Sequence, residues 1–358
     1  MANIDNNTNI NSSEANLAEA VAKETNISEA KGAEGVANGG IISEAGDADL
    51  KAMSRGKARP ASEAVPAPPD VDFSSYRFDE NGKPHKDTVL DADDIMQMVP
   101  KLRGHRKLVD RLIRFLSMDK VNWIHAHNCA HPGPAFCRGL LDDLNIKLRI
   151  DNNEVLENLP EGSFITISNH HFGALDGIIL IDLIGSRRPR YKVMVNMFLN
   201  YIWAMRPSFI AVDQEASNDP KKKAVSMAGI REVIKMVRQG DPVGFFPAGA
   251  VGKIDWKGRL HDREWQPTVI QLIQKAKVPV IPIFFHGSQS WFFNLLGVTC
   301  WQLRTFRHPA EVFRKKGKTF HITVGNPISP EEQQAHMGSE KEFSDFLREQ
   351  TYRLRKVK

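Results

Sequence analysis

The stretch that decides the fold is residues 163–177, which read SFITISNHHFGALDG. Its first part, residues 163–168, has the short apolar and hydroxyl-bearing composition of a buried strand. A turn of small and polar residues follows, and an apolar helical pattern occupies residues 175–184. We therefore predict a strand that passes through a short turn directly into a helix.

Strand and helix patterns alternate from this stretch towards the C-terminus. Helical patterns occur at residues 219–238 and 267–276. Strand-like runs occur at residues 190–195, 209–212, 242–246, 278–285 and 319–324. This alternation predicts an α/β domain over residues 151–358, with a mixed, mostly parallel sheet flanked by helices. Functional residues are then expected at the carboxyl ends of the strands.

Residues 71–150 are predicted to form a helical N-terminal subdomain. Asp91 or Asp93 suits the cap of a helix that ends at Pro100, and a further helix is expected near residues 134–144. Between them, apolar residues recur at helical spacing among lysines and arginines, at Leu108, Leu112, Phe115 and Leu116. This basic, amphipathic face suits a membrane contact, and an ordinary solvated face fits the pattern equally well.

Residues 1–70 are predicted to be a disordered, low-complexity tail. They are rich in Ala, Glu, Asn, Ser and Gly, and the tripeptide Ser-Glu-Ala recurs at Ser13, Ser28, Ser43 and Ser62. Such a segment buries too little apolar surface to offset its ordering entropy. A docking segment built from these repeats is the alternative interpretation.

The net charge of +5 is unevenly distributed. Residues 1–69 hold ten acidic and six basic side chains, a net charge of −4, which leaves +9 for residues 70–358. A basic body attracts anionic partners such as phospholipid head groups or an acidic carrier protein. Nucleic acid is not expected as a partner, because the sequence contains no recognised binding module.

Cysteine usage and hydropathy indicate a reducing compartment. Cys129, Cys137 and Cys300 show neither a disulfide framework nor metal-knuckle spacing. The first forty residues contain no signal-peptide pattern, and no stretch approaches the ~20 apolar residues of a membrane-spanning helix. We expect the cytoplasm, or a peripheral position on the cytoplasmic face of the inner membrane.

The turn after the predicted strand carries the candidate catalytic residues. His170 and His171 are close enough in sequence to Asp176 for an imidazole and a carboxylate to face each other. A neutral histidine accepts the proton of an attacking hydroxyl, and a carboxylate fixes its tautomer and stabilises the imidazolium. On these residues alone, the alternative is that Asn169 and Asp176 cap the turn and that both histidines are structural.

Residues 168–176 (SNHHFGALD) resemble the Asn-His…Asp block of PlsC-type glycerol-phosphate and lysophospholipid acyltransferases. The resemblance is closest to the bacterial haemolysin-like branch of amino-acid lipid O-acyltransferases, whose block reads N-H-P-x-G-G-x-D-G. Three further blocks follow in the family's order, at residues 207–213 (PSFIAVD), 244–251 (GFFPAGAV) and 278–283 (VPVIPI). The resemblance implies a glycerolipid acyltransferase-like fold and makes residues 151–358 an acyltransferase domain.

The same resemblance implies roles for individual residues. Asp176 is the partner of the general base; the widespread family spacing fits His171 as that base, and the closer branch fits His170. We favour His170, because His171 stands where that branch usually has proline. The implied substrate-binding residues are Asn169, Phe172, Gly173, Arg206, Phe209, Pro247, Gly249 and Lys253, with no metal and no cofactor. Backbone N–H groups around Gly249 are expected to stabilise the oxyanion, and a plain turn is the alternative.

Departures from the family pattern concern the acceptor. Many members read F-P-E-G-T-R-S in the third block, and its charged groups are associated with a phosphate-bearing acceptor. Here Ala248, Ala250 and Val251 replace Glu, Thr and Arg, and the nearest cations are Lys253 and Arg206. These departures count against glycerol 3-phosphate, and the resemblance implies a lyso amino-acid lipid of the ornithine or glycine type as the acceptor. Acyl carrier protein or coenzyme A is the expected donor thioester. A 1-acylglycerol-phosphate or lysophospholipid acyltransferase and a non-catalytic membrane-binding homologue are the alternatives.

The most aromatic segment is residues 282–296, which suits an acyl groove or a bilayer interface. A core position is favoured for residues 283–285, and residues 291–296 are the better membrane candidate because Trp favours interfaces. The basic residues that follow suit an anionic surface or an acidic carrier protein, and ordinary solvated charge is the alternative: Arg304, Arg307, Arg314, Lys315, Lys316 and Lys318. His125, His127, Cys129 and His131 alternate without a second ligand cluster, and no metal is expected there.

Overall fold

The computed structural model describes residues 59–60, 71–213, 220–254, 260–299 and 301–356. The predicted tail, residues 1–70, lies outside the described residues except for Arg59 and Pro60. The described chain divides into two compact units. Residues 90–119 belong to the smaller unit, and the described residues of 56–89 and 120–358 form the larger one.

The smaller unit contains helices α4 (Ala92–Met98) and α5 (Arg106–Phe115), joined by the 3₁₀-helix η2 (Pro100–Leu102). The Asp91 carboxylate accepts the N–H of Asp94, and the Asp94 carboxylate accepts the N–H of Asp91, so both orphan donors are satisfied. The predicted cap and the helix end before Pro100 are confirmed. The small core of this unit comprises Ala92, Ile95, Val109 and Ile113.

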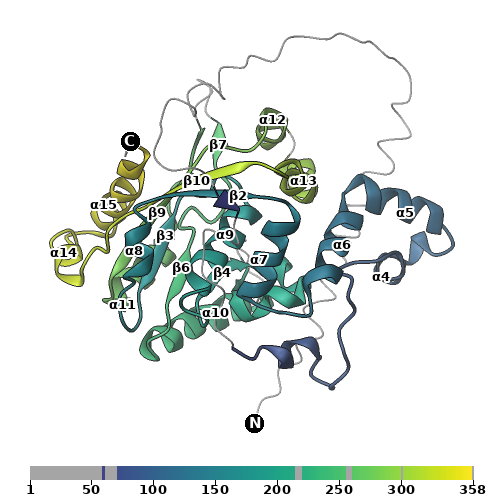
Figure 1. The fold of residues 1–358 in the computed structure, drawn as a ribbon, viewed down its shortest axis with the longest axis horizontal. Helices are drawn as coiled ribbons and strands as arrows, with labels where there is room; N and C mark the ends of the chain where they lie inside the picture. Colours follow the sequence, from purple (N-terminus) through teal and green to yellow (C-terminus); the bar gives the residue numbers. More distant parts are fainter. Residues whose placement is uncertain (1–58, 61–70, 214–219, 255–259, 300, 357–358) are drawn as a thin grey trace, which may run out of the picture. The chain divides into compact units, whose positions relative to one another are not determined.

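The larger unit is built on a sheet of strand order β1-β2-β10-β9-β3-β6-β4-β5 (Figure 1). Among the described strands, the β1–β2 and β9–β10 pairs are antiparallel and the other neighbours are parallel. The predicted mixed, mostly parallel sheet is confirmed. The strand bounds are β1 (Arg59–Pro60), β2 (Lys147–Asp151), β3 (Ile165–Ser168), β4 (Lys192–Asn196), β5 (Phe209–Val212), β6 (Val243–Phe245), β9 (Val280–His286) and β10 (Thr319–Val324).

Helices cover both faces of this sheet because side chains alternate along each strand. Ile281 and Ile283 of β9 join a core with helices α7 (Pro134–Asp143) and α9 (Ala174–Gly185). Ile165 and Ile167 of β3 join a second core with the helices of the opposite face. These helices are α10 (Pro220–Arg238), α11 (Pro267–Ala276) and α15 (Glu340–Arg353).

The remaining elements connect this framework. A separate hairpin pairs β7 (Lys253–Ile254) with β8 (Leu260–His261). The other helices are η1 (Ser74–Arg77), α6 (Met118–Asn128), α8 (Asn153–Glu157), η3 (Met197–Tyr201), η4 (Trp203–Ser208), α12 (Trp291–Thr299), α13 (Trp301–Arg314), α14 (Pro330–Gln334) and η5 (Leu354–Lys356). None of the helices in the described part of the chain combines the length and apolar character that crossing a bilayer requires.

Helix α9 is buried on nearly every side, and one buried ion pair fixes it against α7. The Arg138 guanidinium donates to the Asp182 carboxylate over 3.0 Å and to the Ser186 hydroxyl over 3.0 Å. The Asp182 side chain is fully buried. Burial raises the pKa of Asp182 to about 6, although Arg138 acts in the opposite direction.

Replacement of Arg138 by leucine is expected to destabilise the protein by about 3–5 kcal/mol at pH 8, because Asp182 then remains charged, buried and unpaired. Arg138 acts to lower the pKa of Asp182, so its loss raises that pKa further, and the extra cost of the variant grows as pH rises above about 6, where the wild-type carboxyl is charged. The loss measured by urea unfolding should therefore be smaller at pH 5 than at pH 8. The control is Arg353→Leu, which removes an exposed pair with Glu349 and should change stability little at either pH. Equal losses for Arg138→Leu at both pH values would contradict this account.

Candidate active site

The site begins where β3 ends. The Asn169 side chain donates to the carbonyl of Phe285 over 2.9 Å and accepts the N–H of Phe285 over 2.7 Å. Asn169 is fully buried, so its amide ties the end of β3 to β9. The predicted substrate-binding role of Asn169 is therefore not supported by its position: the side chain holds the framework on which the next residues are mounted.

The turn between β3 and α9 is closed by Asp176. One oxygen of its buried carboxylate, Oδ2, accepts the N–H groups of Phe172 over 2.8 Å and Gly173 over 3.1 Å. The same oxygen lies 3.1 Å from Nδ1 of His170. An ionised carboxylate can only accept a hydrogen bond, so Nδ1 of His170 carries the hydrogen. In the neutral form of this ring, Nε2 then has a lone pair and can act as a base. The His170 side chain remains partly exposed.

Gly173 is required by this turn. Its φ of +68° favours glycine, and a Cβ at this position would lie 3.1 Å from the His308 ring. His308 belongs to α13 and is half-buried. Burial lowers the pKa of His308 to about 4, and the charges of Arg304 and His170 act in the same direction. A second, neutral imidazole therefore lies beside the turn.

His171 faces away from Asp176. Its Nδ1 donates to the carbonyl of Gly287 over 3.1 Å, directly after β9. Its Nε2 lies 3.8 Å from the carboxylate of Asp262. Burial lowers the pKa of His171, whereas the carboxylates of Asp262 and Asp176 act to raise it. Of the two histidines, His170 is the one that the structure pairs with Asp176.

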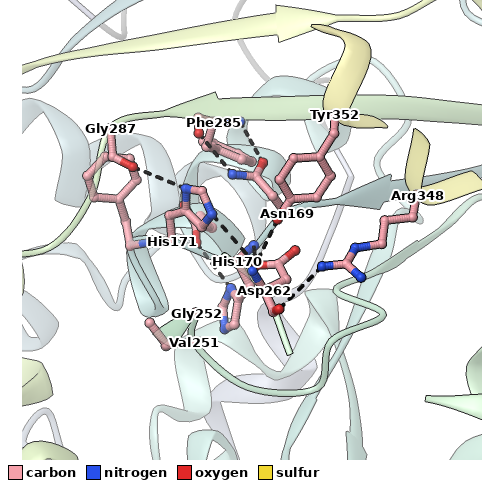
Figure 2. A network of polar contacts seen from close by, with 12 residues as sticks. Asn169, His170, His171, Val251, Gly252, Asp262, Phe285, Gly287, Arg348 and Tyr352 are labelled. Carbon is pink, nitrogen blue, oxygen red and sulfur yellow. Dashed lines mark hydrogen bonds and ion pairs between the residues drawn. The ribbon is translucent and has the colours of Figure 1, made fainter. Parts of the chain in front are cut away.

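Asp262 follows directly after the β7–β8 hairpin and contacts the turn between β3 and α9 from outside that turn (Figure 2). Its carboxylate accepts the N–H of His170 over 3.1 Å. Its own N–H donates to the Tyr352 hydroxyl oxygen over 3.2 Å, and Arg348 donates to its carbonyl over 3.4 Å. No sequence motif identifies Asp262 as a site residue, because its contacts to His170 and Tyr352 each join residues about ninety positions apart in the sequence.

The loop after β6 begins within the third sequence block, residues 244–251. The Phe246 ring lies 4.3 Å, centroid to centroid, from the His170 ring. The N–H of Gly252 donates to the His170 carbonyl over 2.9 Å. Gly249 has a φ of +67°, and its N–H donates to the Phe246 carbonyl over 2.8 Å. The turn itself therefore uses the Gly249 N–H, which is not available to an oxyanion in this conformation.

Two of the predicted surface cations are instead part of this framework. Arg304 is only 6% exposed, and its guanidinium donates to the Gly252 carbonyl over 2.9 Å. Lys315 donates to the Ser288 carbonyl over 2.9 Å and lies 5.0 Å from the centroid of the Phe172 ring. Burial lowers the pKa of Lys315. The expectation that Arg304 faces an anionic surface is wrong, because its side chain is buried. For the half-buried Lys315 it stays a prediction.

The other predicted substrate residues divide into two groups. Arg206 and Phe209 lie at the amino end of β5. Strands β5, β4, β6 and β3 are parallel, and His170 follows the carboxyl end of β3. Arg206 and Phe209 therefore lie at the opposite ends of the strands from His170. The Arg206 guanidinium donates to the Asn200 carbonyl. The structure therefore does not bring Arg206 and Phe209 to the His170–Asp176 pair. In contrast, Pro247 lies in the third-block loop, where its carbonyl accepts the N–H of Gln266.

Gly249 and Lys253 line a surface cavity of about 500 Å³ beside this loop. Its other lining residues are Ala248, Ala250, Arg263, Glu264 and Gln266. Lys253 is exposed there, one residue beyond Gly252, whose main chain bonds His170. Of Arg206 and Lys253, the two cations predicted to meet the acceptor, Lys253 is therefore the one that the fold brings close to the turn between β3 and α9.

The alternating histidines lie on and just after α6, where helical spacing sends them in different directions. His125 is buried and donates to the Asp87 carbonyl, whereas His127 is exposed and pairs with Asp143. Within the described ranges, no group of three or more His, Cys, Asp or Glu side chains is arranged to hold a metal ion.

Comparison with known proteins gives three findings. Residues 98–358 match the model of the family described as Acyltransferase. Two curated relatives are named lyso-glycine lipid O-acyltransferase. One, from Bacteroides thetaiotaomicron, is 27% identical over 251 residues, which cover 67% of this chain and 88% of the relative. The other, from Phocaeicola vulgatus, is 26% identical over 261 residues, which cover 70% of this chain and 88% of the relative.

A solved structure, the 1-acyl-sn-glycerophosphate (LPA) acyltransferase PlsC from Thermotoga maritima, aligns with 61% of this chain and 74% of its own at 15% identity, with a TM-score of 0.39. The family model spans most of the chain and includes the whole turn between β3 and α9. The chain belongs to the acyltransferase family.

Proposed function

We propose that this acyltransferase transfers a fatty acyl group from the thioester of acyl carrier protein or coenzyme A to the hydroxyl of a lysolipid. The acceptor we propose is a lyso amino-acid lipid of the glycine or ornithine type. The observation that carries the proposal is the His170–Asp176 pair at the carboxyl end of β3. Its partly exposed imidazole lies beside a third-block loop that carries Ala248, Ala250 and Val251.

In the proposed reaction, Nε2 of His170 takes the proton of the acceptor hydroxyl while the oxygen attacks the thioester carbonyl carbon. Asp176 stabilises the imidazolium that forms. The tetrahedral intermediate then collapses, the carbon–sulfur bond breaks, and the leaving thiolate takes the proton from the imidazolium. One ester and one free thiol result, and His170 returns to its neutral form.

Two observations support an amino-acid lipid as the acceptor. The named activity of both curated relatives is O-acylation of lyso-glycine lipid. The third-block loop offers small and apolar side chains at positions 248, 250 and 251, where a phosphate would call for arginine or lysine. Arg206, the other candidate cation, belongs to the opposite edge of the sheet.

His170→Gln is expected to lower kcat by ~10²–10⁴-fold, because the general base is removed while the chain stays folded. The assay offers an N-acylated glycine with a 3-hydroxy fatty chain, in mixed micelles, to the purified protein with acyl carrier protein or coenzyme A thioesters. The control is His171→Gln, whose amide keeps a donor for the Gly287 carbonyl and should retain more activity. Undiminished transfer by His170→Gln would remove the general-base role. A preference for 1-acylglycerol 3-phosphate would favour the phospholipid alternative.

We further infer that the protein works at an anionic membrane on the cytoplasmic side. Helix α12 exposes Trp291, which is 73% accessible, together with Phe292 and Leu295, while Phe293 is buried beneath them. The Arg307 guanidinium lies 5.8 Å from the centroid of the Phe292 ring. Exposed cations follow at Arg314, Lys316 and Lys318. Aromatic residues beside cations suit an interface that contains anionic lipid.

Replacement of Trp291 and Phe292 by alanine is expected to reduce co-sedimentation with phosphatidylglycerol vesicles, because the variant loses apolar area that inserts at the interface. Transfer to a short-chain acceptor dissolved in water should be unchanged. Trp123→Ala is the matched control, since Trp123 is 58% exposed on α6. Equal vesicle binding by the control and the double variant would contradict an α12 contact.

A further inference from the structure

Both main-chain polar groups of His170, its N–H and its carbonyl, are hydrogen-bonded. Its N–H donates to Asp262 over 3.1 Å, and its carbonyl accepts the N–H of Gly252 over 2.9 Å. Arg304 in turn holds the Gly252 carbonyl over 2.9 Å. The position of the His170 imidazole therefore depends on two segments that lie outside the turn, the third-block loop and the end of the β7–β8 hairpin.

Asp262 also faces His171, which makes a second histidine–carboxylate pair next to the first. His171 Nε2 lies 3.8 Å from Asp262 Oδ1, the oxygen that accepts the N–H of His170. His171 Nε2 and Asp262 Oδ2 are both buried without a hydrogen-bond partner in the described structure. A buried polar atom without a partner is costly, so this pair gains most by contact with itself.

Attraction within the pair requires a hydrogen between the two groups. His171 Nδ1 already carries a hydrogen, because it donates to the Gly287 carbonyl. An imidazole nitrogen and a carboxylate that both present lone pairs do not bond each other, so the two groups attract only when His171 takes up a second proton. The charged or titratable groups around the pair are His170 and Asp176 from the turn, and Tyr352 and Arg348 from α15.

The pair is anchored at both ends. On one side, His171 binds the chain directly after β9 through Gly287. On the other side, the Asp262 N–H donates to Tyr352 and the Asp262 carbonyl accepts from Arg348, both on α15 (Figure 2). His171 therefore lies between the chain after β9, to which it is hydrogen-bonded, and the Asp262 carboxylate, which it approaches without a hydrogen bond.

We propose that Asp262 is a positioning residue of the acyl transfer, and that with His171 it forms a second histidine–carboxylate pair that holds the His170 peptide against Asp176. The proposal rests on the proposed role of His170 as the base. Asp262 acts through the main chain of His170 and touches no substrate atom. Without it, the His170 N–H loses its acceptor, and the imidazole is no longer held in line with the Asp176 carboxylate.

The experiment compares Asp262→Ala with Asp262→Asn. Alanine removes the acceptor of the His170 N–H, and kcat is expected to fall by about 10²-fold with KM unchanged, since a misplacement of about 1 Å is sufficient for such a loss. Asparagine keeps an oxygen at this position and should recover most of kcat. The control is Asp151→Ala, which removes another largely buried carboxylate paired with a histidine, His321, and should lower stability without a change in kcat.

A second readout does not depend on turnover. The proton on Nδ1 of His170, bonded to Asp176, is expected to give a downfield NMR signal that is sharp in the wild-type protein and in Asp262→Asn, and shifted or broadened in Asp262→Ala. In the double variant Asp262→Ala/His171→Ala, the loss of kcat should match that of Asp262→Ala alone, because residues that act as one unit are not additive.

Wild-type kcat in Asp262→Ala, or equal losses in the alanine and asparagine variants with an unmoved NMR signal, would overturn the proposal. Additive losses in the double variant would overturn the pairing of Asp262 with His171. Should the wild-type protein transfer no acyl group to any lysolipid, the proposed function fails, whereas the NMR comparison still decides whether Asp262 positions His170.

Discussion

The site depends on one buried carboxylate. Asp176 lies in the first turn of α9, where its Oδ2 accepts two main-chain N–H groups and faces the His170 ring. These contacts close the turn and set the tautomer of the histidine at the same time. Because α9 is packed on nearly all sides, the carboxylate has no freedom to move away. The packing of α9 against α7 and the sheet therefore also restricts the position of the His170 imidazole.

The topology of the sheet explains why so many segments meet at this turn. Strands β3, β6 and β9 are neighbours and run in the same direction, so the residues that follow them share one edge. The loop after β6 brings Gly252, and the chain after β9 brings Gly287. Strand β5 runs in the same direction but at the far side of β4, and its amino end carries Arg206 away from the site.

Local patterns predicted most of the strands and helices of the sheet and placed two candidate histidines near Asp176. The strands at residues 209–212 and 319–324 and the helix at residues 267–276 have the predicted bounds. The choice of His170 over His171 rested on the family resemblance, because spacing within the turn allowed either histidine. Strand β2 was not predicted, because its partner β10 follows more than 160 residues later. Asp262 and Arg304 were missed for the same reason: their roles come from contacts between distant segments. The sequence shows where the basic residues are, but it does not distinguish the buried Arg304 from the exposed Arg314.

The third-block loop is attached to the catalytic turn through its main chain. The N–H of Gly252 meets the His170 carbonyl, and its own carbonyl is taken by Arg304. Peptide groups are common to all residues, so the bond itself does not require a particular side chain, whereas the neighbouring Ala248 and Val251 are buried and constrained by packing. Under the proposed function, the half-buried Ala250 and the exposed Lys253 are the positions of this loop at which a different acceptor head group can be met without disturbing the main-chain bond to His170.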